Sequence, residues 1–140
     1  MATTRENRAK GSVFAQAYKR AQRALASGFY LEAIIICDSL MTDRLRLVME
    51  SNHEVPTDRA TTGSIVNFLL GKKVTSFDDN LWNDILQWSR RRNQQAHEMG
   101  NISGESLIPW RTRLAEAKLV AQSGFSLVNR VSKESGRHRL

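Results

Sequence analysis

The chain has 140 residues, of which 41% are hydrophobic and 25% charged, so it can bury a core and has the composition of a globular domain. Its single cysteine, Cys37, excludes an internal disulfide framework, and no apolar run approaches the roughly 18 residues that a membrane span needs. The net charge of +7 favours a polyanionic partner, and the polar N-terminus leads us to expect a cytoplasmic protein with no membrane association.

The first part of the chain predicts an arm and then a helix. Residues 1–12 are charged, lack apolar periodicity and end in Gly11-Ser12, so we expect a flexible basic arm. From Val13 to Ser27 apolar residues recur on one face of a helix. Gly28 is typical of a helix end, so the helix should stop there.

A longer helix is expected from about Phe29 or Tyr30 to Glu50. Asp38 falls in the middle of its apolar stripe, and a carboxylate that faces inward needs a partner. Two partners are open at this point. Asp38 either forms an ion pair with a surface arginine such as Arg44, or it reaches Arg92 or His97 and holds that side chain in place.

The rest of the chain predicts a short helix and two long ones. The short helix is capped by Thr61 or Thr62, the next begins near Asn80, and the last begins at Pro109 and contains small residues that would let another helix approach. Connecting segments are expected at 51–60, 72–79 and 99–104, and a disordered basic tail at 133–140. We therefore predict a single all-α domain over 13–132, a compact bundle of four long helices plus one short helix.

Polar residues interrupt the apolar stripe of the helix that is expected to begin near Asn80. The stripe reaches Trp88 and then, at the same spacing, meets Arg92, Asn93, Ala96 and His97. The pattern thus predicts that these polar side chains lie on the buried face. A buried arginine is costly unless it is paired or used, so such a conflict often marks a functional site.

Arg92 and His97 suit metal-free cleavage of RNA. A guanidinium clamps a phosphate with a planar fork of donors, and an imidazole moves a proton near neutral pH. One group would remove the proton of the 2′-hydroxyl, and the other would stabilise the charge that develops on the phosphate. Asn93 lies four residues before His97 and is expected to support it. Histidine and cysteine show no zinc-ligand spacing, and no phosphate-binding loop is present, so no metal or cofactor is expected.

The spacing of the two residues also predicts a dimer. Five residues along a helix give about 7.5 Å of rise and about 140° of rotation, so Arg92 and His97 do not stack on one another. Two copies that face each other across a two-fold axis would bring two arginines and two histidines into one cleft.

The segment Arg92-Asn93-x-x-x-His97 resembles the Arg-polar-x3-His signature of the HEPN superfamily, and the run that opens the second helix at Gly28 is similar to many members. The resemblance covers about residues 13–130. It implies a HEPN-like all-α fold, a homodimer with the motifs at the interface, and a metal-independent endoribonuclease that leaves a 2′,3′-cyclic phosphate. It implies Arg92 and His97 as catalytic residues, and Arg90 and Arg91 are expected to bind RNA.

Many proteins of this family act as toxins or in phage defence, so the resemblance also implies an antitoxin or a larger defence complex as partner. Two other functions stay open. The chain would otherwise be a non-catalytic helical module that binds nucleic acid or a protein through its basic surface. It would alternatively be a structural subunit of an assembly, with the small residues of the last helix against another chain.

Overall fold

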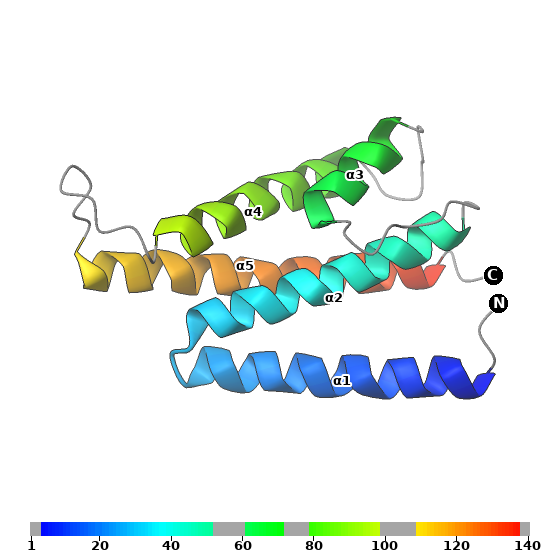
Figure 1. Ribbon diagram of the computed structural model, residues 1–140, viewed down its shortest axis with the longest axis horizontal. Helices are drawn as coiled ribbons and strands as arrows, with labels where there is room; N and C mark the ends of the chain where they lie inside the picture. The colour runs from blue at the N-terminus through cyan, green and yellow to red at the C-terminus, as the bar shows by residue number, and fades with distance from the viewer. Residues whose placement is uncertain (1–3, 52–60, 72–78, 99–108, 138–140) are drawn as a thin grey trace.

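The computed structural model describes residues 4–51, 61–71, 79–98 and 109–137, and every regular element in these ranges is an α-helix (Figure 1). The helices are α1 (Thr4–Ala26), α2 (Tyr30–Ser51), α3 (Thr62–Gly71), α4 (Asp79–Glu98) and α5 (Trp110–Arg137). The prediction of an all-α bundle of four long helices and one short helix is confirmed. The expected connections at 52–60, 72–78 and 99–104 lie outside the described residues. None of the described helices is both long and apolar enough to cross a membrane.

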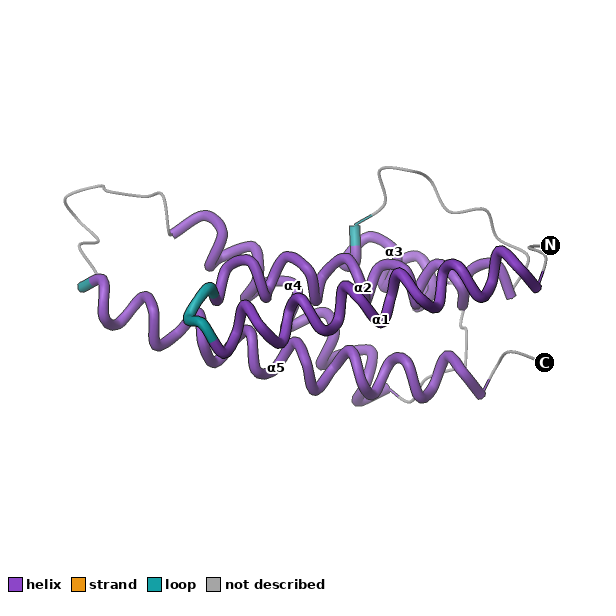
Figure 2. The backbone as a smooth tube through the Cα atoms, turned by 90° about the horizontal axis from the view of Figure 1, so that it is seen from below, coloured by secondary structure: helices purple, strands orange, loops and turns teal. Residues whose placement is uncertain are grey.

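The long helices lie along one axis of an elongated bundle (Figures 1 and 2). α2 and α5 pack most extensively on each other, α1 packs on α2, and α4 packs on α5 and on α3. The helices bury apolar side chains from all five elements in one shared core. The largest fully buried side chains are Trp82, Trp88, Ile34, Met41, Leu45, Ile65, Leu69, Leu81 and Ile85.

The turn between α1 and α2 is set by one glycine. Gly28 has a φ of 82°, in the left-handed region that glycine adopts without a steric penalty. The Phe29 amide donates to the Ala24 carbonyl at 2.8 Å, and the Gly28 amide donates to the Leu25 carbonyl at 3.2 Å. This pair of bonds is a Schellman motif, which satisfies carbonyls at the helix end and reverses the chain. The predicted stop at Gly28 is confirmed.

The small residues of α5 allow the close helix packing that the sequence predicts. Ala117, Ala121 and Gly124 are all buried. A Cβ atom added to Gly124 would lie 2.9 Å from Cζ2 of Trp88 on α4 and 3.2 Å from Cβ of Cys37 on α2. Three helices therefore meet at Gly124, and Trp88 Nε1 adds a hydrogen bond to the Val120 carbonyl of α5 at 2.9 Å.

The predicted boundaries are wrong at both ends of the domain. Residues 4–12, expected in a flexible arm, form the first turns of α1. Gly11 does not end the helix, because an exposed glycine inside a helix costs only about 1 kcal/mol, and Arg8, Ala9 and Lys10 before it are good helix formers. The tail expected at 133–140 is helical as far as Arg137. Val131 still packs in the core there, and no residue that breaks a helix follows it directly.

Candidate functional site

An ion pair between α4 and α2 lies at the centre of the candidate site. Nη2 of Arg92 is 3.5 Å from Oδ2 of Asp38, and both side chains are largely covered, at 31% and 19% exposure. Nη1 of Arg92 donates to Oδ1 of Asn93 at 2.8 Å, while Nε is buried and has no hydrogen-bond partner. The contact predicted between Asp38 and Arg92 is present. The guanidinium of Arg44, the alternative partner, instead lies 3.8 Å from the centre of the Phe14 ring.

Thr62 bonds the Asp38 carboxylate, and Thr42 bonds the backbone carbonyl of Asp38. Thr62 on α3 is 1% exposed, and its hydroxyl donates to Oδ1 of Asp38 at 2.8 Å. Thr42, one turn along α2, donates to the Asp38 carbonyl at 2.9 Å and lies 2.8 Å from the Thr62 hydroxyl. With Oδ1 bound by Thr62, Oδ2 is the oxygen that faces Arg92. Hydrogen bonds of this kind cut the freedom of the carboxylate and so fix the arginine across from it.

The first residues of α3 show why the Thr62 hydroxyl is not needed for helix capping and can bond Asp38 instead. Thr61, and not Thr62, is the capping residue, because its hydroxyl accepts from the Ser64 amide at 3.2 Å. The Thr61 amide in turn donates to the Ser64 hydroxyl at 2.9 Å. Thr61 therefore caps α3, and the adjacent Thr62 forms the hydrogen bond to Asp38 of α2. The sequence gives no sign of the second role, since either threonine suits the capping position.

The buried face of α4 does not continue as the sequence predicts. Only Arg92 is partly buried, whereas Asn93, Ala96 and His97 are exposed. Gln95 is buried in their place, at 6% exposure. Gln95 lies seven residues after Trp88 and three after Arg92, so the covered face of α4 continues through Arg92 to Gln95. His97, nine residues after Trp88, lies about 180° around the helix from it and is therefore exposed. His97 forms no hydrogen bond or ion pair with any of the described residues.

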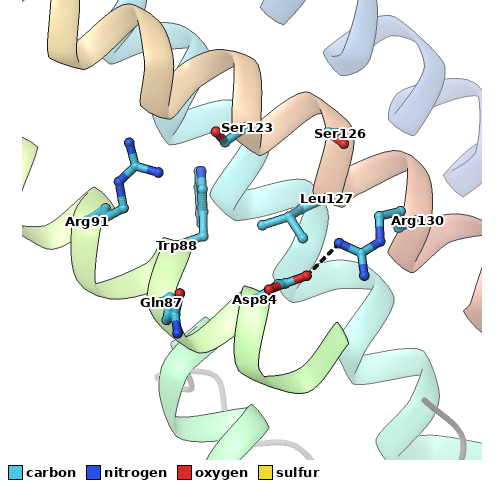
Figure 3. A pocket seen from close by; sticks show the side chains of 8 residues that line it. All are labelled: Asp84, Gln87, Trp88, Arg91, Ser123, Ser126, Leu127 and Arg130. Carbon is cyan, nitrogen blue, oxygen red and sulfur yellow. Dashed lines mark hydrogen bonds and ion pairs between the residues drawn. The ribbon is translucent and has the colours of Figure 1, made fainter. Parts of the chain in front are cut away.

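The two neighbouring arginines point elsewhere. Arg90 is exposed and lines no hollow that we identify among the described residues. Arg91 is also exposed, but it lines two adjoining hollows between α4 and α5, with volumes of about 260 Å³ and 230 Å³. Figure 3 shows the first of them. The structure thus brings Arg92, Asn93 and Asp38 together, and it separates Arg90, Arg91 and His97 from that cluster.

Cys37, beside Asp38, is buried and is not suited to nucleophilic chemistry. Burial, with the neighbouring Asp38 carboxylate as a second cause, raises the pKa of its thiol to about 12. A thiol with this pKa stays protonated at neutral pH, and the thiolate is the nucleophilic form. Among the described residues no group of three or more His, Cys, Asp or Glu side chains has the arrangement of a metal site.

Within one chain the geometry allows two separate actions. Arg92 is held in place from α2 and α3 and can present a fixed cation to a phosphate. His97 is exposed, so solvent and an incoming ligand can reach it, and it can accept or donate a proton. The rotation of about 140° between them along α4 keeps the two groups on different faces of the helix.

Comparison of the chain with protein-family models, curated proteins and solved structures returned no match. The function therefore has to be argued from the chemistry of the site.

Proposed function

We propose that this protein is a metal-independent endoribonuclease of the HEPN type, in which Arg92 and His97 act in a cleft shared by two subunits. In this proposal His97 transfers the proton of the attacking 2′-hydroxyl, and Arg92 stabilises the charge on the phosphate. The oxygen attacks the adjacent phosphorus, the bond to the leaving 5′-oxygen breaks, and a 2′,3′-cyclic phosphate remains. We further propose that it works as a toxin or phage-defence effector in the cytoplasm.

The observation that carries the proposal is the way Arg92 is held. A surface arginine samples many conformations, and ordering it on a substrate costs free energy. Here Asp38 and Asn93 bind two nitrogens of the guanidinium, and Thr62 fixes Asp38 from a third helix. Such preorganisation is what electrostatic catalysis needs, because the cation does not reorganise when charge develops on the substrate.

The proposal is tested by digesting RNA with purified protein in the presence of EDTA. We expect cleavage by the parent chain and products that end in a 2′,3′-cyclic phosphate. His97→Ala should abolish cleavage without changing the folded structure, because the side chain is exposed. Arg92→Lys keeps the charge but loses the planar fork, so we expect about a hundredfold loss of rate, of the order that removing one stabilising donor produces.

His53→Ala removes a histidine outside the motif and serves as the matched control, which should cleave like the parent. Circular dichroism would establish that each variant is folded. If His97→Ala, purified in parallel, cleaves RNA as fast as the parent, the assignment of the active site is wrong and any activity comes from elsewhere.

A second function is favoured by the exposed arginines. Arg90 and Arg91 carry uncompensated charge on the surface of α4, which suits a module that binds nucleic acid without cleaving it. This function predicts salt-dependent binding of RNA with no products, for the parent and for His97→Ala alike.

A further inference from the structure

We propose that the groove between α4 and α5 binds the sugar-phosphate backbone of single-stranded RNA and leads it towards His97. The inference rests on the proposed function for the choice of RNA as ligand. The groove consists of the two adjoining hollows that share Arg91, and its walls are one face of α4 and one face of α5. Figure 3 shows the first of the two hollows.

The lining of the groove suits phosphate and sugar oxygens. Its polar side chains include five neutral ones, namely Gln87, Gln94, Gln95, Ser123 and Ser126. The charged ones are the arginines Arg91 and Arg130 and the carboxylates Asp84 and Glu116. Its floor is apolar, formed by the buried side chains of Trp88, Val120 and Leu127. Uncharged amides and hydroxyls bind backbone oxygens without reading the base sequence, so the lining favours a chain of phosphates over a single charged side chain of a protein.

The charges of the groove are unevenly compensated. Figure 3 shows Arg91 and Arg130 at opposite ends of the first hollow, with Trp88 and Leu127 between them. Arg130 donates to Asp84 at 2.8 Å, and both partners are nearly half exposed. Arg91 lines the second hollow together with the exposed carboxylate of Glu116, but it forms no ion pair with Glu116 or with any other of the described residues. It is therefore the cation that is ready to bind a phosphate, while Arg130 is held by Asp84.

The groove also has a path to the predicted catalytic residue. Arg91, Gln94 and His97 follow at intervals of three, and residues spaced in this way form a continuous ridge on the surface of a helix. All three side chains are exposed. A strand that leaves the groove along this ridge therefore reaches His97 at the end of α4.

The test uses binding alone, in His97→Ala protein, so that cleavage does not interfere. Affinity for a short unstructured RNA is measured by fluorescence anisotropy at several salt concentrations. Because each phosphate contact contributes about 0.7 to the slope of log K against log salt, Arg91→Gln should lower that slope by about 0.7 and the affinity by about fourfold at physiological salt. Arg23→Gln, which removes the same charge from an exposed site on α1, should have little effect.

In a second pair of variants, the change in the groove should raise the affinity for RNA instead of lowering it. Asp84→Asn removes the carboxylate that holds Arg130, so binding should become about fourfold tighter. Glu32→Gln is the matched control, because it frees Arg20 from an exposed ion pair of 2.9 Å outside the groove and adds the same net charge. Tighter binding by Asp84→Asn alone, together with weaker binding by Arg91→Gln alone, supports the groove.

The groove proposal is overturned if either variant behaves like its control, or if the protein does not bind RNA. The two proposals fail separately. If the parent chain never cleaves RNA but the four variants bind as described, the catalytic proposal is wrong and the groove stands. If the parent cleaves RNA and Arg91→Gln binds like Arg23→Gln, the groove is wrong and the catalytic proposal stands.

Discussion

Three consecutive arginines on α4 have three different surroundings. Arg90 is exposed, Arg91 lines the groove against α5, and Arg92 is paired with Asp38 of α2. Successive residues of a helix point about 100° apart, so a run of like residues is distributed around the helix. Composition alone therefore says little about what each of these charges does.

These surroundings predict different effects on stability. Arg92→Ala removes the cation next to a carboxylate that is only 19% exposed, so we expect the free energy of unfolding to fall by about 1–3 kcal/mol. Arg90→Ala, on the same helix, should change it by less than about 0.5 kcal/mol. Arginine and alanine have similar helix propensities, so the two changes are comparable. Urea unfolding measures both, and equal losses would mean that the ion pair contributes no net stability.

At the scale of the elements, Gly124 determines how closely three helices approach. Any side chain at this position meets the Trp88 ring and Cβ of Cys37. Both neighbours are buried, so neither can move away without disturbing the core. The packing of α5 against α2 and α4 therefore depends on the absence of one methyl group.

For this reason, substitutions at two different glycines should change the free energy of unfolding in opposite directions. Gly124→Ala should lower the free energy of unfolding by about 1–3 kcal/mol, since overpacking outweighs the gain in helix propensity. Gly11→Ala, in exposed α1 with nothing within 4 Å of the added atom, should raise it by up to about 1 kcal/mol. Thermal unfolding would measure both. A stabilised Gly124→Ala protein would show that the helices separate easily at this crossing.

The elements were largely predictable from sequence, and the site only in part. Apolar periodicity and Gly28 located the helices because burial and helix ends depend on local sequence. The inward position of Asp38 was visible for the same reason. The contact of Thr62 with Asp38 could not be predicted in this way, because it joins residues that are 24 apart in the chain. His97 is exposed, contrary to the prediction, because it lies nine residues after Trp88, about half a turn around the helix, while Arg92 and Gln95 continue the covered face.

At the scale of the whole molecule, one chain leaves the catalytic proposal incomplete. Arg92 and His97 lie on different faces of α4, so a second copy has to supply the missing group. In this proposal, ribonuclease activity requires two copies of the chain to associate.

This dependence is measurable by dilution. We expect sedimentation equilibrium to show a monomer–dimer equilibrium, and the ribonuclease activity per subunit to fall as the protein is diluted through it. The loss should be reversed by concentrating the sample. A chain that is monomeric at every concentration yet keeps its activity per subunit would rule out a shared cleft.

The hydrogen bond from Trp88 to the Val120 carbonyl ties the two walls of the groove together at its floor. The spacing of those walls is thus set before any ligand arrives, so in the proposed complex the conformational adjustment on binding falls on the RNA. A flexible single strand can adjust its conformation at little cost in free energy, whereas a stiff double helix cannot. We therefore expect the groove to prefer single-stranded over double-stranded RNA because of this difference in stiffness, and not because of base sequence.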